Sequence, residues 1–213
     1  AGAGATNTES GAPFTLSLLG AGGDPDTTDV LPVETVALVS GNVSVVATTG
    51  TGIFTLNPSD ALAMALGETE VISYTYDVVE SDDGGTELSR TATTATITIT
   101  GTNDAPTVGA VTGGSSEDDA AFSVDLLGNS SDPDTTDVLT VSNVTLNGGD
   151  ASGVTLNGTD LDVDPAAYHY LADGGSAVIS YTYDVVESDD IGTELSRTAT
   201  TATITITGTN DAP

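Results

Sequence analysis

The sequence predicts an all-β protein built from two tandem Greek-key β-sandwich domains arranged end to end. Three observations support this fold class: short runs in which apolar and polar residues alternate, turn residues about every ten positions, and a near-duplication of the chain. When residues 71–106 are placed over residues 178–213, the two segments differ only where Gly84 corresponds to Ile191. We therefore expect two domains, residues 1–105 and 106–213.

About seven short strands are expected in each domain, as in sandwiches of the immunoglobulin or cadherin type. In the first domain, alternating apolar and polar residues place strands at residues 1–8, 14–19, 30–39, 43–49, 53–56, 71–78 and 87–100. The clearest counterparts in the second domain lie at residues 107–111, 122–127 and 138–146. The Cys…Trp…Cys signature of true immunoglobulin domains is absent from the sequence.

One segment of each domain does not alternate. It spans residues 58–66 in the first domain and residues 165–172 in the second. Each segment begins with proline behind Asn57 or Asp164 and continues with helix-forming residues, which predicts a short helical turn. The strand that follows this turn in the first domain has a period of two, which places on one face Ile72, Tyr74, Tyr76 and Val78.

The composition excludes several classes of partner. The chain has 2 basic and 32 acidic residues, and its formal net charge is -30. Such a surface repels nucleic acid and anionic lipid, so we expect no nucleic-acid partner and no membrane insertion. High net charge with few aromatic residues is also typical of disorder. The hydrophobic share of 38% lies in alternating runs, however, and this favours a folded chain whose charge is partly offset by bound divalent cations.

The chain contains no cysteine, which excludes disulfides, zinc–thiolate sites and cysteine nucleophiles. No stretch approaches the roughly 18 apolar residues of a membrane span, and the first residues lack the features of a signal peptide. We expect the chain to be an excerpt of a longer array of repeats. In such an array, calcium ions would supply the cross-links that disulfides provide in many secreted domains.

A six-residue motif, Gly-Thr-Asn-Asp-Ala-Pro, closes each repeat at residues 101–106 and 208–213. In each copy a threonine-rich strand stops at the glycine, and an Asn-Asp pair follows before the proline. Proline restricts its own backbone and that of the residue before it. The motif therefore predicts a short, semi-stiff linker that carries oxygen ligands.

The loops of a sandwich alternate between its two ends. We expect the loop at residues 24–29 and the hairpin at residues 81–85 at the end where the chain enters the domain. The turns that contain Glu9 and Asn57 are expected at the end where the chain leaves. If two domains follow each other directly, the acidic residues of both ends meet at the linker.

Carboxylate and amide oxygens are the ligands that Ca²⁺ prefers, at six to eight oxygens per ion, so we expect about two or three calcium ions at each joint. The expected ligands at the joint are Glu9, Asn57, Asn103, Asp104, Asp132, Asp134, Asp137, Glu187, Asp189 and Asp190. Equivalent ligands at the outer ends are Asp24, Asp26, Asp82, Glu117, Asp164, Asn210 and Asp211. Simpler alternatives stay open: a merely polar linker, a solvated Asp-Pro-Asp loop, and an ordinary hairpin turn at Asp82.

Three sequence features resemble the VCBS and cadherin-like tandem repeats of giant bacterial surface adhesins, including the extender repeats of RTX adhesins. They are the linker motif, the run Asp-Pro-Ala-Ala-Tyr-His-Tyr-Leu-Ala at residues 164–172, and the hairpin Asp-Asp-Gly-Gly-Thr at residues 82–86. The resemblance covers nearly the whole chain. It implies an extracellular, calcium-stiffened stalk, exported by type I secretion, that holds an adhesive domain away from the cell in attachment or biofilm formation.

The sequence departs from the resembled families in two respects. The cadherin joint reads Asp-x-Asn-Asp-Asn, of which only the central pair is present as Asn103 and Asp104. The glycine-rich nonapeptide calcium repeats of RTX proteins are absent. The first departure leaves the number of ions open, and the secretion route is implied by the resemblance alone.

The same reasoning predicts a non-enzymatic, monomeric rod whose partners are calcium ions and neighbouring repeats of the chain. His169, the one histidine, corresponds to Leu62 in the first repeat, which argues against catalysis. Arg90 and Arg197 are expected to pair with carboxylates on their own sheets. The alternative function is that the repeats themselves bind a ligand such as ice, a glycan or a host protein, for example through the threonine row at Thr94, Thr96, Thr98, Thr100 and Thr102.

Overall fold

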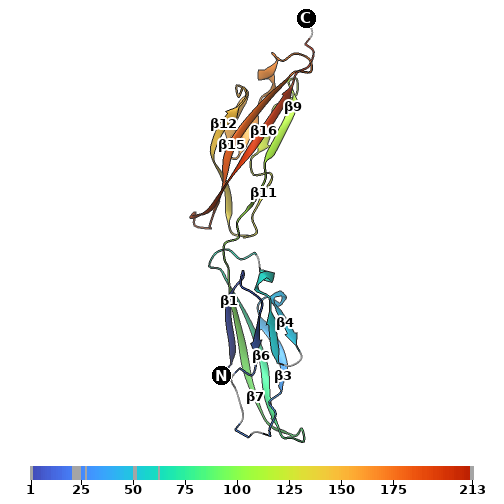
Figure 1. Ribbon diagram of the computed structural model, residues 1–213, viewed down its shortest axis with the longest axis vertical. Coiled ribbons are helices and arrows are strands. Elements are labelled where there is room, and N and C mark those ends of the chain that lie inside the picture. Colours follow the sequence, from blue (N-terminus) through green and yellow to red (C-terminus); the bar gives the residue numbers. More distant parts are fainter. Residues whose placement is uncertain (1, 21–24, 27, 50–51, 62, 212–213) are drawn as a thin grey trace. The chain divides into compact units, whose positions relative to one another are not determined.

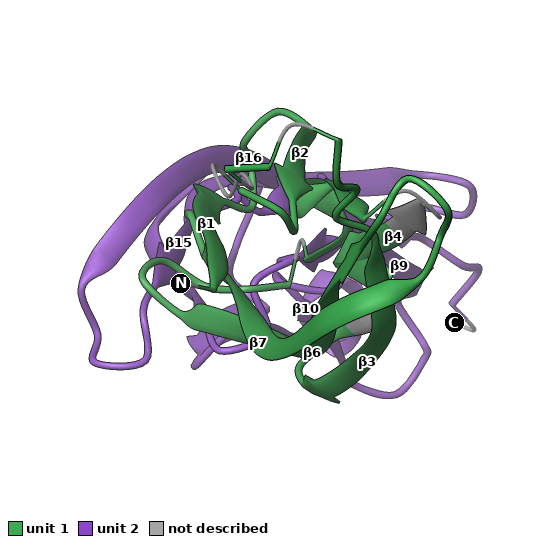
Figure 2. Ribbon diagram, turned by 90° about the horizontal axis from the view of Figure 1, so that it is seen from below, with its two compact units in different colours: residues 1–103 green, residues 104–213 purple. Residues whose placement is uncertain are grey.

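The computed structural model describes the chain except for residues 1, 21–24, 27, 50–51, 62 and 212–213 (Figure 1). The chain forms two compact units, unit 1 (Ala1–Asn103) and unit 2 (Asp104–Pro213), which are coloured separately in Figure 2. Both units are built almost entirely of strands. In the part of the chain that the structure describes, no helix combines the length and the hydropathy that crossing a bilayer requires.

Unit 1 consists of a four-stranded sheet packed against a three-stranded sheet. The larger sheet has the order β1-β7-β6-β3, and the smaller has the order β2-β5-β4. The β1–β7 pair is parallel, whereas the other strand pairs given for unit 1 are antiparallel. The strands are β1 Ala3–Thr8, β2 Phe14–Ser17, β3 Val33–Ser40, β4 Val46–Thr49, β5 Ile53–Leu56, β6 Thr69–Ser81 and β7 Glu87–Thr100.

Unit 2 repeats this arrangement. Its larger sheet has the order β12-β15-β16-β9, its smaller sheet the order β10-β14-β13, and the short strands β8 and β11 pair with each other. Strand β9 pairs in parallel with β16, as β1 does with β7. The strands are β8 Thr107–Val108, β9 Val111–Ser116, β10 Phe122–Asp125, β11 Ser130–Ser131, β12 Val138–Gly148, β13 Val154–Asn157, β14 Asp160–Val163, β15 Ser176–Ser188 and β16 Glu194–Thr207.

A hydrophobic core lies between the two sheets of each unit. The expected inner face of β6 is confirmed for Ile72, Tyr74 and Tyr76, which are at most 5% exposed. In each unit a buried tyrosine spans the core: Tyr76 Oη donates to Leu18 O at 2.6 Å, and Tyr183 Oη donates to Leu126 O at 2.7 Å. The predicted all-β sandwich class is confirmed.

The start of the third strand differs from the prediction in unit 1. Strand β3 begins at Val33, not at residue 30, and Val30 makes only an isolated bridge to Ser81. The reason is Pro32, which has no N–H to give to the neighbouring strand. In unit 2 Thr140 occupies the equivalent position, and β12 begins at Val138 as predicted.

The first strand of the second repeat was predicted wrongly. Residues 107–108 pair with β11, and the strand equivalent to β1 is β9, which contains Gly113 and Gly114. Strand propensity disfavours glycine, but a Cβ atom on Gly113 would lie 2.4 Å from Val124 Cγ2. Close packing of β9 against β10 therefore requires a residue that the sequence pattern assigns to a turn.

The predicted helical turns are present, but as η2 (Pro58–Ala61) and η3 (Pro165–Tyr168) they are shorter than the expected residues 58–66 and 165–172. The strand predicted at residues 43–49 begins only at Val46, because Val43–Val45 form the 3-10 turn η1. The Asp164 side chain accepts a hydrogen bond from Ala166 N at 3.2 Å, as expected of a cap. Tyr168 is 0% exposed and anchors η3 to the core, which places the next residue, His169, at the surface of unit 2.

The expected pairing of the arginines is confirmed. Arg90 forms salt bridges with Glu34, Asp77 and Glu87, and Arg197 with Asp184 and Glu194. These pairs lie on the outer faces of the larger sheets.

Candidate metal centres

Each unit has a buried glutamate at its C-terminal end. Glu9 and Glu117 are both 0% exposed. Their backbone N–H groups donate to the last strands, Glu9 N to Thr100 O and Glu117 N to Thr207 O, each at 3.0 Å. These hydrogen bonds hold the turn that follows β1 or β9 against the end of the last strand of the same unit.

Only one oxygen of each buried glutamate is satisfied by the protein. Glu117 Oε1 accepts a hydrogen bond from Thr209 N at 2.6 Å, and Glu9 Oε1 accepts from Thr102 N and from Thr102 Oγ1. The second oxygen, Oε2, is buried and has no hydrogen-bond donor among the described residues in either unit. An unsatisfied buried polar group costs about 1–3 kcal/mol, and more when it is charged. A bound cation would remove this cost.

Other expected ligands at these ends serve the local structure. Asn57 Nδ2 donates to Asp60 Oδ1 at 3.0 Å, and Asn57 Oδ1 accepts from Ser59 Oγ at 3.0 Å, so Asn57 stabilises η2. Asp164 caps η3. Asn103 Oδ1 is buried without a hydrogen-bond partner in the described part of the chain, and Asn210 Nδ2 donates to Asp211 O.

A cluster of carboxylates lies at the N-terminal end of unit 2. Asp132, Asp134 and Glu187 each offer an oxygen within 4.8 Å of the other two, and Asp134 and Glu187 are only 2% and 0% exposed. Two backbone hydrogen bonds of 2.9 Å order the cluster, from Asp104 N to Asp134 Oδ2 and from Asp134 N to Asp132 Oδ1. The Asp-Pro-Asp loop and the β15 strand end are thus brought together as the sequence predicted.

The carboxylates of this cluster repel one another. Burial raises the pKa of Asp137 to about 6, and the negative charges of Asp134, Glu187 and Asp132 add to the shift. The pKa of Asp132 is also raised, mainly by burial and further by the charge of Glu187. Asp132 Oδ2, Glu187 Oε1 and both Asp137 oxygens are buried and accept no hydrogen bond from the residues that the structure describes. The cluster therefore holds several oxygens that a hard cation can coordinate.

The hairpin aspartates have a different role. Asp82 Oδ1 accepts from Gly84 N at 3.0 Å and Thr86 N at 2.7 Å. Its counterpart Asp189 makes the same pair of bonds in unit 2, at 3.2 and 2.6 Å. These side chains close the turn, which is the simpler alternative that the sequence left open, and Asp190 is exposed beside them.

The N-terminal end of unit 1 is described in part. Asp24 lies outside the described residues, and Asp26 is exposed. Glu80, the counterpart of Glu187, is half-buried, and its Oε2 accepts from Ser89 Oγ at 2.6 Å. Ser196 bonds to Glu187 Oε2 in the same way.

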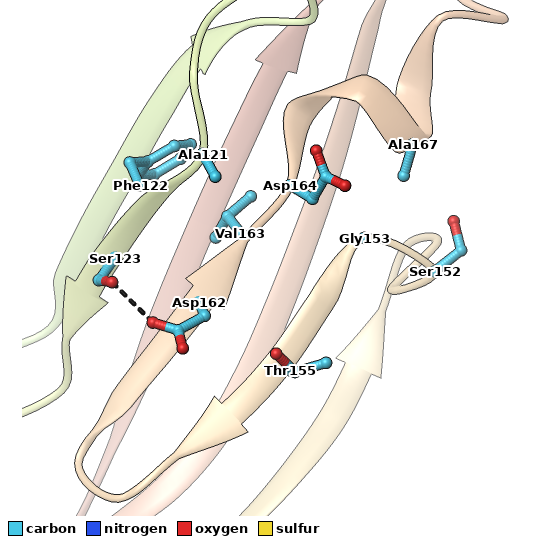
Figure 3. A pocket seen from close by; sticks show the side chains of 10 residues that line it. All are labelled: Ala121, Phe122, Ser123, Ser152, Gly153, Thr155, Asp162, Val163, Asp164 and Ala167. Carbon is cyan, nitrogen blue, oxygen red and sulfur yellow. Dashed lines mark hydrogen bonds between the residues drawn. The ribbon is translucent and has the colours of Figure 1, made fainter.

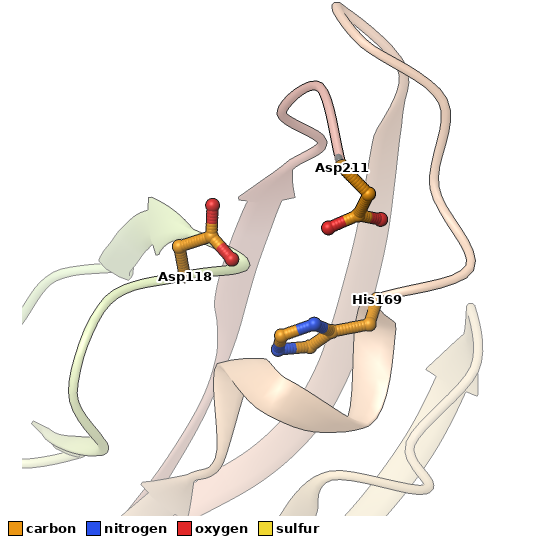
Figure 4. Close-up of side chains that lie close together, drawn as sticks. All are labelled: Asp118, His169 and Asp211. Carbon is orange, nitrogen blue, oxygen red and sulfur yellow. The ribbon is translucent and has the colours of Figure 1, made fainter. Parts of the chain in front are cut away.

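One group at the C-terminal end of unit 2 was not singled out by the sequence. His169, Asp118 and Asp211 each offer a ligand atom within 4.8 Å of the other two (Figure 4). The sequence predicted Asp211 as a calcium ligand, argued against a catalytic role for His169, and gave no reason to expect a ligand at Asp118. The sequence contained one indication of this group: Asp118 lies next to Glu117 and His169 follows the proline-led turn, and both of these segments are expected at the end where the chain leaves the domain.

Unit 2 also carries a hollow of about 450 Å³ on its smaller sheet (Figure 3). Phe122 and Ser123 of β10, Thr155 of β13, and Asp162 of β14 are among the residues that line it. Asp162 accepts from Ser123 Oγ at 2.6 Å and from Asn157 Nδ2 at 2.9 Å, and these bonds lower its pKa. The hollow combines one aromatic ring with hydroxyl groups and two carboxylates, those of Asp162 and Asp164.

Comparisons with known proteins give structural similarity only. No protein-family model and no curated protein sequence matches the chain. Chicken VE-cadherin EC1-2 is 15% identical, with 98% of this chain and 97% of that chain covered and a TM-score of 0.34. Drosophila N-cadherin EC1-4 is 13% identical (96% and 47% covered, TM-score 0.32), and a SusE-like surface-located polysaccharide-binding protein of Bacteroides thetaiotaomicron is 12% identical (98% and 34% covered, TM-score 0.27). At these values the similarity carries no information about function.

Proposed function

We propose that the chain is a pair of calcium-binding extender repeats from the stalk of a large bacterial surface adhesin. Calcium bound at the acidic ends of the units restricts the linker and stiffens an extracellular stalk, which holds a distal adhesive domain away from the cell. The observation that carries this proposal is the set of buried carboxylate oxygens without hydrogen-bond donors in the described structure, on Glu9, Glu117, Asp132, Asp137 and Glu187.

Calcium fits these ends better than other common cations. The oxygens come from carboxylates and an amide, and the chain has no cysteine. Calcium accepts six to eight oxygen ligands in irregular geometry, whereas Mg²⁺ demands a near-ideal octahedron and retains its water. The loop carboxylates are arranged differently at the two ends of a unit, and calcium accepts such varied coordination geometry more readily than magnesium does.

The same carboxylates explain how binding changes stiffness. Without a cation, burial and, next to it, the like charges of the neighbouring carboxylates raise the pKa of Asp137, so its charged form is unfavourable in the folded unit. A divalent ion reverses this repulsion and ties the loops to the linker residues that follow or precede them. The function is mechanical and needs no catalytic group.

The first experiment compares the chain in calcium, in magnesium and in chelator. Calcium at 100 times its dissociation constant stabilises a site by about 2.7 kcal/mol, and each kcal/mol shifts Tm by about 4–8 °C in a domain of this size. Chelation should therefore lower Tm by about 10–20 °C and broaden the distance distribution in small-angle X-ray scattering. Unchanged melting and scattering would show that calcium is not the stiffening element.

A variant locates the effect at the carboxylate cluster of unit 2. Glu187→Gln removes one buried charge, so it should weaken calcium binding by at least tenfold in calorimetry and raise the Tm measured in chelator. Glu194→Gln is the matched control, because Glu194 lies in the neighbouring strand and pairs with Arg197 at the surface. Equal calcium affinity in both variants would remove Glu187 from the binding site.

The hollow of unit 2 favours a second candidate function, glycan binding. Sugars bind through aromatic faces and through hydroxyl–carboxylate hydrogen bonds, and Phe122, Ser123 and Asp162 offer both. A glycan array followed by an NMR titration tests this function. Binding that is lost in Asp162→Ala would support it, whereas an array without any signal would exclude it.

A further inference from the structure

The cluster of Asp118, His169 and Asp211 contains a nitrogen ligand, which separates it from the other acidic ends. Figure 4 shows the imidazole ring and the two carboxylates facing a common space, each from a different part of unit 2. Asp118 follows β9, His169 ends η3, and Asp211 follows β16. The three ligand atoms lie within 4.8 Å of one another.

The distances are close to those that a metal ion requires. Zn²⁺ binds imidazole nitrogen and carboxylate oxygen at about 2.0–2.2 Å, so ligand atoms in a tetrahedral site are about 3.4 Å apart. All three side chains are exposed and can rotate. The side chains must still move closer to contact one ion, and Asp118 can do so while Thr209 Oγ1 donates to its Oδ2. The buried Tyr168 keeps η3 in place.

A second observation, which also supports the proposed calcium binding, points to a cation at this end of unit 2. Glu117 is 0% exposed, and its Oε2 has no hydrogen-bond donor in the described part of unit 2. Thr209 links it to the cluster, since Thr209 N donates to Glu117 Oε1 at 2.6 Å and Thr209 Oγ1 donates to Asp118 Oδ2 at 2.6 Å. An uncompensated buried carboxylate thus adjoins the exposed group of three ligands.

The ligand set determines the class of ion. Calcium and magnesium prefer oxygen, whereas imidazole is a ligand of zinc and the neighbouring first-row transition metals. One imidazole and two or three carboxylates, without thiolate, match a divalent ion such as Zn²⁺ with water completing its coordination. The first repeat has Ser10 and Leu62 where the second has Asp118 and His169, so its sequence lacks two of the three ligands.

We propose that the C-terminal end of unit 2 is a site for a divalent transition-metal ion of the Zn²⁺ class, bound by His169, Asp118 and Asp211. The site is specific to the second repeat. It shares Asp211 with the expected calcium ligands but depends on the imidazole, which calcium does not use. Binding of a transition metal there is therefore a property distinct from calcium-dependent stiffening.

The test uses the full chain without a histidine tag, so that the imidazole signals come from a single residue. Zn²⁺ is added while the His169 ring protons are followed by NMR, and Co²⁺ is added while visible absorption is recorded. We expect one equivalent of Zn²⁺ to shift the ring signals and to displace Co²⁺ from a coloured complex. Ring signals that do not respond to either metal would overturn the proposal.

Variants separate this site from the calcium ligands. His169→Leu introduces the residue of the first repeat and should reduce Zn²⁺ affinity at least tenfold in calorimetry, as should Asp118→Ser. Asp83→Asn, with the same loss of one charge in unit 1, should leave Zn²⁺ affinity unchanged. Calcium-dependent melting should persist in His169→Leu, and its loss would indicate misfolding, which the NMR spectrum of the variant would reveal. Undiminished Zn²⁺ affinity in well-folded His169→Leu would refute the proposed site.

Discussion

The C-terminal ends of the two units share a buried glutamate but differ in the residues around it. Glu9 and Glu117 accept a hydrogen bond from the backbone N–H of Thr102 and Thr209, respectively. The next residue is Ser10 in unit 1, which bonds to Thr102 Oγ1 at 2.7 Å. In unit 2 it is Asp118, which accepts from Thr209 Oγ1 at 2.6 Å. The buried part of the end is thus the same in both units, while the exposed part carries an additional negative charge in unit 2.

This difference shows which positions the fold constrains. The glutamate carboxylate is enclosed by the turn and the linker, so a change there leaves buried groups without partners. The neighbouring position needs only a hydrogen-bond partner for the threonine hydroxyl, which is a serine hydroxyl in unit 1 and an accepting carboxylate in unit 2. A potential metal ligand, Asp118, therefore occurs in unit 2 beside a buried glutamate that has the same hydrogen bonding in both units.

The largest effect is expected from neutralising the two buried glutamates. Glu9→Gln and Glu117→Gln retain an oxygen that can accept from the threonine N–H but remove the charge. Each should cost its own unit a tenfold or greater loss of calcium affinity, or about 1.4 kcal/mol, and raise that unit's Tm in chelator.

The measurement is differential scanning calorimetry at several calcium concentrations, with the exposed Glu87→Gln and Glu194→Gln as controls. If the calcium dependence of Tm changed in only one of the two variants, the C-terminal ends of the two units would not bind calcium in the same way.

A smaller and more uniform effect is expected in the cores. Tyr76→Phe and Tyr183→Phe each remove a buried hydroxyl and leave a backbone carbonyl, Leu18 O or Leu126 O, without this donor. The free energy of unfolding of the affected unit should fall by about 1 kcal/mol, with and without calcium. Chemical denaturation followed by tyrosine fluorescence and NMR measures the loss. Clearly unequal losses would mean that the two cores are not equivalent.

The smallest effect concerns pH and the carboxylate cluster of unit 2. The folded-state pKa of Asp137 is raised to about 6 from an ordinary value of 3.8, so its protonated form favours the folded state. In chelator, the Tm of unit 2 should therefore rise as the pH falls from 7.5 to 5. In calcium it should fall over the same range, because protons compete with the ion.

Asp137→Asn should abolish most of the rise seen in chelator, whereas Asp190→Asn at the exposed hairpin should preserve it. Asp162 and Asp184 have lowered pKa values, so their protonation acts below this pH range. A Tm in chelator that falls between pH 7.5 and 5 would argue against repulsion in the cluster.

Much of the fold was predictable from local patterns. Alternation placed the inner face of β6, and the proline-led segments predicted η2 and η3. Two strands differ from the prediction because of single residues and their contacts with a neighbouring strand. Pro32 delays β3, and Gly113 belongs to β9 because Val124 leaves no room for a side chain.

The candidate site was predictable in its residue types but not in their roles. The sequence singled out Glu9, Glu117, Asp132 and Glu187 together with Asp82 and Asp189, because all are acidic turn residues. The first four have buried oxygens without donors among the described residues, whereas the last two close hairpins. His169 was missed because its partners, Asp118 and Asp211, are 51 and 42 positions away along the chain.

The sequence by itself determined the repeat, the strand periodicity and the inventory of oxygen ligands, since each is a property of neighbouring residues. Tertiary structure alone decided which carboxylates are buried, which are used by turns, and which stand beside a histidine. Burial and coordination depend on residues that are distant in the chain and meet only when the two sheets pack. Acidic residues that look alike in the sequence therefore have different roles in the folded protein, according to their burial and their neighbours.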